Sequence, residues 1–461
     1  MGTASAPLGR PGDHPDQNLA DDLAEHLAEH AAGRPADDAI WPRVTRELAD
    51  DLAFDALARD RAGKVPFDEV ARLQEAGLPA LLTAPGPGRR GADWRAASAV
   101  VREISAADSS VGELLAHHYA LSWSGRFFGP VRKPGGRRPS GPALDVRTAE
   151  GGWLLAGGIE PPCAETGPGL MLTPAATGPG WVLDGARTFA SAVTVADRLV
   201  VGARPGGTGE LLVVLVDPAR DGVFTDAATD RVGQRLAGAG TVTFDRVPVP
   251  PEDVIGAVPQ DEHAVAPYTT LAPLALRLLL VQVALGVAEG ALAEARDIRR
   301  AGKAAPAPAP AGYPGGHPIG LPGADGTGTI SAGDDPYLLL AYGELATAAH
   351  AAAAVVERAT DALARGLLAA RSLGVEERAD IAVLVAAAET VTGRAAVHIT
   401  TRVLELVDGT AGADVRSGGP GFDRFWRNAR TLTAPTRAAH RLRDIGDHYL
   451  NGSHARLTLP A

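Results

Sequence analysis

The sequence contains a single cysteine, Cys163, so the chain cannot form an intramolecular disulfide bond. A positive net charge is also lacking, since 55 Asp and Glu outnumber 44 Lys and Arg: the net charge is −11 at pH 7 and the pI is about 5.6, so no broad positive field attracts nucleic acid or anionic lipid. We therefore expect neither nucleic acid nor a membrane as a partner. The first residues lack the basic segment and apolar run of a signal peptide, which favours a cytoplasmic protein.

A long uninterrupted apolar run is missing as well. The longest apolar stretch, 271–292, carries Arg277, Gln282 and Glu289 at spacings that leave polar positions on a helix. A membrane-spanning helix needs about 20 predominantly apolar residues. We therefore interpret this stretch as a core helix.

Clusters of metal ligands are equally absent. His26 and His30 share one face of a helix, but no third ligand follows them, and a solvated face explains the pair. No His lies near Cys163 in the sequence, and its place beside Pro161 and Pro162 is typical of a turn. We expect no metal site.

What the sequence does contain is globular: 45% of its residues are hydrophobic and 21% charged, over a length that allows more than one layer of structure. Apolar residues recur at helical spacing, give way to short β-branched runs between turn residues, and then return to helical spacing. The late helices are expected at 271–300, 335–366, 375–408 and 422–450. The predicted parts are a flexible tail (1–36), an N-terminal helical domain (37–135), a middle antiparallel β-domain (136–257) and a C-terminal four-helix bundle (258–461). A Pro/Gly-rich insert, 304–333, interrupts the bundle as either a disordered insertion or an active-site lid.

Two segments within the β-rich region, 180–191 and 233–250, resemble the middle β-domain of the acyl-CoA dehydrogenase superfamily. The order of helices, β-domain and helical bundle is also the order of that α+β fold. In that family the first segment is a strand, a Gly-containing turn and a second strand that bring small polar residues against a flavin ring. The resemblance therefore implies a flavoprotein, while its reaction has to be argued from the site.

The catalytic base of the acyl-CoA dehydrogenases is missing from both positions where that family places it. One position lies just after an Arg of the last helices, where this chain reads Arg430-Thr-Leu-Thr-Ala-Pro-Thr436 without an acid. The other directly precedes an Arg on the first bundle helix, and here Leu276 precedes Arg277. Removing the substrate's α-proton requires such a carboxylate. Simple dehydrogenation of an acyl-CoA is therefore disfavoured.

Three other segments resemble the two-component flavin monooxygenase branch of the superfamily, the dibenzothiophene monooxygenase-like enzymes: 106–119, 334–337 and 422–430. This resemblance implies a cytoplasmic enzyme that oxygenates a small metabolite, in secondary metabolism, with molecular oxygen as co-substrate. It implies a separate flavin reductase that supplies reduced FMN or FAD, with FMN favoured, and a homodimer or homotetramer with flavin near a subunit interface. Water has to be excluded, because leakage of the oxygenated flavin releases hydrogen peroxide.

The resemblance assigns catalytic roles to His118 and Ser191. His118 falls where the branch keeps a His near the flavin, able to donate to the oxygenated flavin or accept a proton near neutral pH. Ser191 follows Phe189 at the flavin's reactive edge, and both are expected to bind the cofactor. Two alternatives stay open: His118 can be satisfied within a helix contact, and Ser191 can cap a turn. Neighbouring His117 is expected to be structural.

Three residues of the helical bundle are further candidates for cofactor binding. Asn428 and Arg430 belong to the family's flavin-facing segment, and Arg300 lies where relatives carry a basic residue for the flavin phosphate. Contacts between helices or subunits are the alternative for Asn428 and Arg430.

Leu432 and Pro435 depart from the branch, whose members usually have His at both positions. His440 lies further along and compensates only if its helix bends towards the flavin. Two other functions therefore stay open. One is an atypical dehydrogenase-like flavoprotein that catalyses a non-oxygenating oxidation or a dehydration, and the other is a non-catalytic binding protein that has lost flavin.

Overall fold

The computed structural model describes residues 40–86, 90–129, 143–159, 169–206, 210–258, 265–304, 335–408, 421–433 and 435–453. The tail 1–36, the pair His26 and His30, the residue Cys163 and almost all of the insert 304–333 lie outside these ranges, so the predictions made for them stay predictions.

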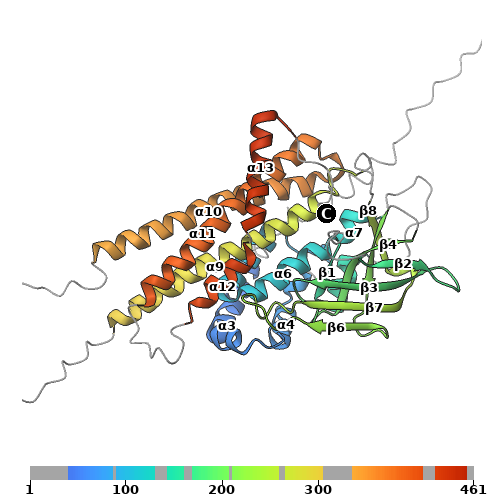
Figure 1. Cartoon of the computed structure of the whole chain (residues 1–461), viewed down its shortest axis with the longest axis horizontal. Helices are drawn as coiled ribbons and strands as arrows, with labels where there is room; N and C mark the ends of the chain where they lie inside the picture. The colour runs from blue at the N-terminus through green and yellow to red at the C-terminus, as the bar shows by residue number, and fades with distance from the viewer. Residues whose placement is uncertain are drawn as a thin grey trace, which may run out of the picture.

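The N-terminal part is helical, as predicted, and lies beside the long C-terminal helices (Figure 1). Its elements are α3 (Ile40–Ala62), α4 (Phe67–Glu75), the short η1 (Leu78–Ala80), α5 (Trp94–Ala107), α6 (Ser109–Ser122) and α7 (Ser124–Phe128). Asp93 caps α5 by accepting the backbone N–H of Ala96, and Asp108 separates α5 from α6 by accepting from two N–H groups at the start of α6. A further helix, α8 (Leu144–Gly151), precedes the first strand and was not anticipated by the sequence pattern.

Eight strands form a sheet in the order β6-β7-β3-β2-β4-β5-β8, with β1 paired to β4. They are β1 (Leu155–Gly158), β2 (Met171–Pro174), β3 (Trp181–Phe189), β4 (Arg198–Pro205), β5 (Leu211–Val216), β6 (Val223–Ala227), β7 (Gly240–Val249) and β8 (Val254–Val258). The expectation of a purely antiparallel sheet is wrong in one respect, because β4 runs parallel to both β1 and β2. The two resembling segments contribute β3 and β7, which pair antiparallel through most of their length.

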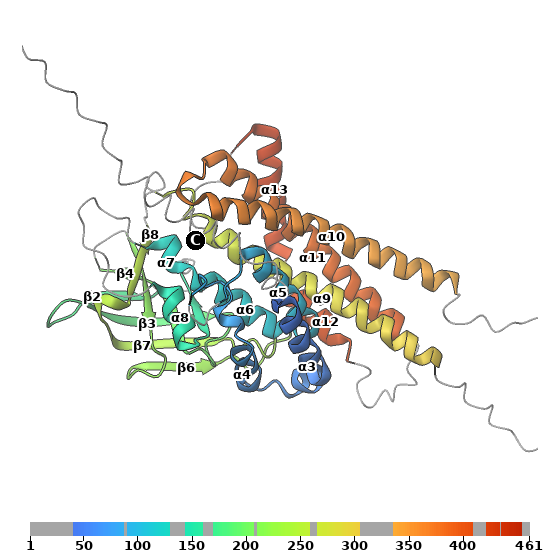
Figure 2. The same ribbon diagram turned by 180° about the vertical axis from the view of Figure 1, so that it is seen from behind.

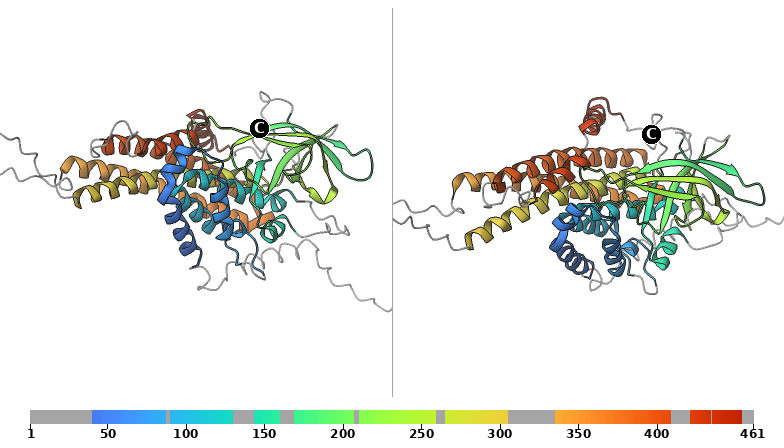
Figure 3. Two further views of the ribbon diagram at one scale, coloured as in Figure 1. Left: turned by 90° about the horizontal axis from the view of Figure 1, so that it is seen from below. Right: turned by 60° about the horizontal axis from the view of Figure 1, so that its bottom comes forward.

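Three long helices build the C-terminal part and extend away from the sheet (Figures 2 and 3): α9 (Leu271–Ala304), α10 (Pro336–Ala369) and α11 (Val375–Asp408). The predicted fourth helix is broken into α12 (Asp423–Leu432) and α13 (Pro435–Asn451). The backbone leaves the helical region at Thr433, and α13 begins at Pro435, where a proline is well tolerated at the start of a helix.

All three long helices are long and apolar enough to cross a membrane by length and composition alone. In α9, however, 78% of the most apolar window is buried inside the protein, which confirms a core helix. Two of its glycines, Gly286 and Gly290, lie so close to α5 that an added Cβ would meet the carbonyl oxygens of Arg102 and Ala106 at 2.5 and 2.1 Å. This tight crossing places α5 and α6 beside the start of α9, where the helices meet the sheet.

Candidate active site

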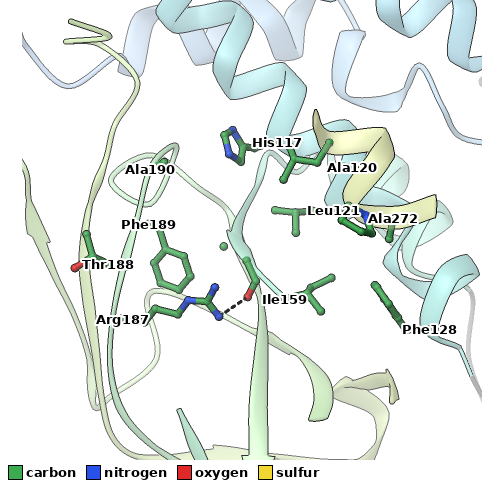
Figure 4. Close-up of a pocket in the computed structure, with 14 residues that line it drawn as sticks. His117, Ala120, Leu121, Phe128, Ile159, Arg187, Thr188, Phe189, Ala190 and Ala272 are labelled. Carbon is green, nitrogen blue, oxygen red and sulfur yellow. Dashed lines mark hydrogen bonds between the residues drawn. The ribbon is translucent and has the colours of Figure 1, made fainter. Parts of the chain in front are cut away.

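A pocket of about 170 Å³ lies between the helices and the sheet, where α6, α7 and the start of α9 face β1 and the end of β3. Figure 4 shows His117 and Ala190 on one side of it and Phe128 and Ala272 on the other. The residues around it are His117, Ala120, Leu121, Phe128, Gly157, Gly158, Ile159, Arg187, Thr188, Phe189, Ala190, Ala272, Pro273 and Leu276. Most of this wall is apolar, and within the described part of the chain it contains no carboxylate.

The turn after β3 is held firmly against the sheet. Ala192 has a left-handed backbone, with φ of 66°, and its N–H donates to the carbonyl of Ala237 at 2.7 Å. The guanidinium of Arg231 donates to the carbonyl of Ala190 at 2.8 Å. Backbone strain of this kind persists only where the surroundings hold it, and it occurs often at functional sites. The turn therefore presents Phe189 and Ser191 in one defined arrangement.

Ser191 is 1% exposed, and its Oγ has no hydrogen-bond partner among the described residues. A buried hydroxyl without a partner is uncommon in a folded protein and calls for an explanation, such as a group that binds there. Ser191 directly follows Ala190, which lines the pocket. The structure thus leaves a hydrogen-bonding group unused at the place where the resemblance puts a flavin contact.

Arg187 supplies the positive charge of the pocket. Its Nη1 donates to the carbonyl of Gly158 at 3.2 Å, and its guanidinium carbon lies 5.3 Å from the centre of the Phe189 ring. Figure 4 shows the guanidinium turned into the pocket beside Phe189. The cation is therefore held by β1 and by an aromatic face, and it faces whatever the pocket binds.

His118 does not line the pocket, and the catalytic role predicted for it does not fit this structure. The side chain is fully buried, its Nε2 lies 2.8 Å from the carbonyl of Pro79, and its Nδ1 accepts the N–H of Leu155 at 3.0 Å. Those partners require the neutral form with the proton on Nε2. Burial lowers the pKa of His118 to about 4, so the ring stays neutral and joins η1 to β1. This is the helix-contact alternative left open above.

His117 takes the place at the pocket instead. Its Nδ1 donates to the carbonyl of Glu113 at 3.0 Å, and this bond leaves the lone pair of Nε2 available to the pocket. Burial, and then the charge of Arg231, lower the pKa of His117, so the ring is neutral at neutral pH. The sequence could not distinguish the two histidines, because adjacent helical residues point in different directions and only the orientation of α6 decides which one reaches the pocket.

The three bundle residues predicted to bind cofactor do not reach this pocket within one chain. Both polar groups of the Asn428 amide are used internally, since Oδ1 accepts the N–H of Gln234 at 2.7 Å and Nδ2 donates to the Oγ of Ser109 at 2.9 Å. Asn428 thus connects α12 to α6, which is the inter-helix alternative. Arg430 is exposed and lines a different cavity of about 490 Å³ between α9, α11 and α12. Arg300 is exposed near the far end of α9, roughly 40 Å from the pocket at about 1.5 Å per helical residue.

Three further residues singled out in the sequence have defined positions in the structure. Leu276 lines the pocket where some dehydrogenases place their base, and Leu432 lines the cavity that contains Arg430. His440 is exposed on α13 and does not line the pocket. Among the described residues no group of three or more His, Cys, Asp or Glu side chains is arranged to hold a metal ion.

No family model matches the chain. It is 30% identical to dibenzothiophene monooxygenase of Rhodococcus erythropolis over 398 residues, which covers 83% of this chain and 86% of the relative. It is 27% identical to the probable FMNH2-dependent monooxygenase SfnC of Pseudomonas putida over 384 residues, covering 82% and 87%.

Solved structures of monooxygenases also resemble the chain in fold and sequence. FMN-bound TdsC from Paenibacillus sp. A11-2 superposes with a TM-score of 0.75 at 27% identity, covering 90% of this chain and 98% of that one. Methanesulfinate monooxygenase MsuC from Pseudomonas fluorescens superposes with a TM-score of 0.74 at 26% identity, over 90% and 98%.

Proposed function

Because this chain belongs to the dibenzothiophene monooxygenase-like family of flavin monooxygenases with the acyl-CoA dehydrogenase fold, we propose that it oxygenates a small, largely apolar metabolite in the pocket between α6 and β3. The cofactor is reduced FMN and the co-substrate is molecular oxygen. The observation that carries the proposal is the pocket itself, which has apolar walls, a guanidinium, an imidazole and no carboxylate among its described lining residues. The unpartnered buried hydroxyl of Ser191 directly follows its lining residue Ala190.

The residues at the end of β3 fit a flavin. Phe189 offers an aromatic face, the Oγ of Ser191 offers a buried hydrogen bond, and Arg187 offers a positive charge beside Phe189. Reduced FMN held there would supply the two electrons that activate oxygen. The protein's own part is to fix the ring, to exclude water with the apolar wall, and to present the Nε2 of His117 as a hydrogen-bonding group.

The substrate class follows from the lining. A flat or compact apolar body fits against Leu121, Phe128 and Leu276. An electron-rich heteroatom can accept a hydrogen bond from Arg187, and an N–H or O–H group of the substrate can donate one to His117. The relatives named above are a dibenzothiophene and a methanesulfinate monooxygenase, and we propose a small sulfur-containing or aromatic substrate for this chain as well. A role in secondary metabolism and a cytoplasmic location are part of the same proposal.

A separate flavin reductase would deliver the reduced FMN, and the enzyme would be a homodimer or homotetramer. The role proposed for Arg300 requires such an oligomer, because a basic residue roughly 40 Å from its own pocket can bind a flavin phosphate only in another copy. Sedimentation measures this directly, and a monomer under assay conditions would contradict it.

Stopped-flow absorbance tests the central claim. The purified protein is mixed with FMNH2 and then with oxygenated buffer, and we expect a flavin–oxygen species that outlives the reoxidation of free FMNH2. His440→Gln, an exposed His outside the pocket, is the matched control for Ser191→Ala and His117→Phe. Both site variants should shorten the lifetime of the species by at least about tenfold.

Labelled oxygen separates this function from the non-oxygenating alternative that Leu432 and Pro435 leave open. Turnover under oxygen-18 should place one labelled atom in the product. A product without label would reject oxygen transfer in favour of an oxidation or a dehydration. Failure to bind FMN in a micromolar titration would instead support a non-catalytic binding protein.

A further inference from the structure

A second cavity, in the C-terminal helices, has no role in the function described so far. It has a volume of about 490 Å³ and lies where α9, α11 and α12 pack together (Figure 1). Leu276 of α9 lines the active-site pocket, whereas the next residue, Arg277, lines this cavity. Adjacent residues of a helix point in different directions, so α9 separates the two spaces. We call the second one the bundle cavity.

The lining of the bundle cavity combines an apolar wall with an excess of positive charge. Leu280 and Val397 belong to the apolar part, and four arginines line the cavity with them. Among the described lining residues the only acid is Glu389. Its Oε2 accepts from Nε of Arg277 at 3.0 Å and from Nε of Arg441 at 3.1 Å. The one negative charge of the lining is therefore already compensated.

Two of the four arginines have no partner. Arg277 and Arg402 each pair with a carboxylate. Within the described part of the chain, Arg394 and Arg430 have neither an ion pair nor a hydrogen bond, and both are exposed enough for a bound molecule to reach them. This concentration of cations runs against the net charge of the chain, which is −11. A guanidinium group suits oxyanions, because its fixed fork of donors matches their geometry.

The two unpaired arginines come from different helices but start from neighbouring backbone. A Cβ added at Gly393 of α11 would lie 3.5 Å from Cγ2 of Thr433, just after α12. Arg394 directly follows Gly393, and Arg430 lies about one helical turn before Thr433. The packing of α11 against α12 therefore brings both positive charges to one part of the cavity.

Thr392 supplies an independent sign that a polar group binds here. It is 1% exposed and lines the cavity, yet its Oγ1 has no hydrogen-bond partner among the described residues. The other threonines of α11, Thr390, Thr400 and Thr401, each donate to the carbonyl four residues earlier, at 2.9, 2.7 and 2.7 Å. A helical threonine commonly satisfies its hydroxyl in this way. A buried hydroxyl without a partner calls for an explanation, such as a bound group.

We propose that the bundle cavity is a second binding site, which takes an organic oxyanion: a sulfonate or carboxylate group on an apolar body. Arg394 and Arg430 bind the oxyanion, and the hydroxyl of Thr392 donates to it. Leu280 and Val397 contact the apolar body. The volume of about 490 Å³ suits a small organic molecule. This site is additional to the proposed function and does not depend on it.

Calorimetric titration of the full chain tests the charge. The probes are naphthalene-1-sulfonate, its neutral analogue naphthalene-1-sulfonamide, and inorganic phosphate. We expect the sulfonate to bind at least about tenfold more tightly than either of the others, because it alone has both the charge and the apolar body. Arg394→Gln and Arg430→Gln should each weaken sulfonate binding by about 3- to 10-fold and leave sulfonamide binding unchanged. Arg402→Gln is the matched control, since that guanidinium already has a carboxylate partner.

A pair of threonine variants tests the hydroxyl. Thr392→Val should weaken sulfonate binding by about 3- to 10-fold without lowering stability, because it removes a buried hydroxyl that has no partner in the free protein. Thr390→Val is the matched control, because Thr390 lines the same cavity but its hydroxyl is used within α11. Unaltered sulfonate affinity in Arg394→Gln, Arg430→Gln and Thr392→Val would overturn the proposal.

Two other occupants give different results in the same variants. If the cavity holds the phosphate of FMN, both unpaired-arginine variants weaken the binding of FMN and leave that of riboflavin unchanged. If an acidic segment of a second copy covers it, Arg394→Gln/Arg430→Gln lowers the oligomeric state in sedimentation and sulfonate affinity stays the same. Either result would overturn the proposal. A chain that binds the sulfonate as expected but never oxygenates a substrate would contradict only the proposed function.

Discussion

Replacing His118 by Gln should remove a pH-dependent part of the protein's stability. The ring is fully buried and joins three elements, because Nε2 lies 2.8 Å from the carbonyl of Pro79 and Nδ1 accepts the N–H of Leu155 at 3.0 Å. Burial lowers its pKa to about 4 in the folded protein, whereas an exposed His in the unfolded chain titrates near about 6.5. The folded state therefore takes up this proton only well below the pH at which the unfolded state does.

The sign of the effect follows directly. Between about pH 6.5 and pH 4 the unfolded chain binds more protons at this residue, so the free energy of unfolding decreases as the pH falls. From pH 7.5 to pH 5 the loss from His118 alone amounts to about 2 kcal/mol. Glu113 works in the opposite direction, because burial raises its pKa and so makes stability fall as the pH rises towards about 7, but it is present in both proteins and cancels in the difference.

Urea unfolding of the wild-type protein, His118→Gln and His440→Gln at pH 7.5 and pH 5 measures this difference. At pH 7.5 the His118 variant should be less stable by about 1–3 kcal/mol, because the amide cannot satisfy both backbone groups as the ring does. At pH 5 that gap should narrow by about 2 kcal/mol, while exposed His440 should behave as wild type. A gap that stays constant between the two pH values would refute the assignment of His118 as a neutral structural residue.

Further predictions concern the contacts that position the pocket. Arg59→Met should destabilise the protein by about 3–5 kcal/mol in chemical denaturation, because it leaves the buried carboxylate of Asp108 without its charge partner. Gly290→Ala should cost about 1–3 kcal/mol and loosen the crossing of α9 over α5, since the new Cβ would meet the carbonyl of Ala106 at 2.1 Å; normal stability would show that the two helices are not in tight contact. Asn428→Ala should lower stability by about 1–3 kcal/mol without abolishing FMN binding, and loss of FMN binding at unchanged stability would restore the direct cofactor contact predicted from the sequence.

Local pattern was sufficient for most elements of the fold. The β-branched runs at 198–202 and 211–216 became β4 and β5, and the apolar stretch 271–292 became the buried part of α9. The pattern failed where the cause is not periodicity. The parallel pairing of β4 with β1 and β2 depends on how distant segments meet, and the end of α12 at Thr433 is a backbone change that apolar spacing does not report.

The candidate site likewise contains residues that local sequence predicted and residues whose positions depend on packing. Phe189 and Ser191 were predicted because they lie on one continuous strand and turn, whose motif is local. The sequence could not predict that His117 and not His118 lines the pocket, since this depends on the rotation of α6 against β1.

The sequence by itself determined the order of helices, strands and bundle, the strand and turn that carry Phe189 and Ser191, and the absence of a dehydrogenase base. Each of these depends on consecutive residues or on a residue that is missing. The tertiary structure decided which histidine lines the pocket, that Glu113 is buried, and that Asn428 joins α12 to α6. These are matters of helix rotation and burial, which fix the direction of a side chain and the pKa of an ionisable group only once segments from distant parts of the chain have packed.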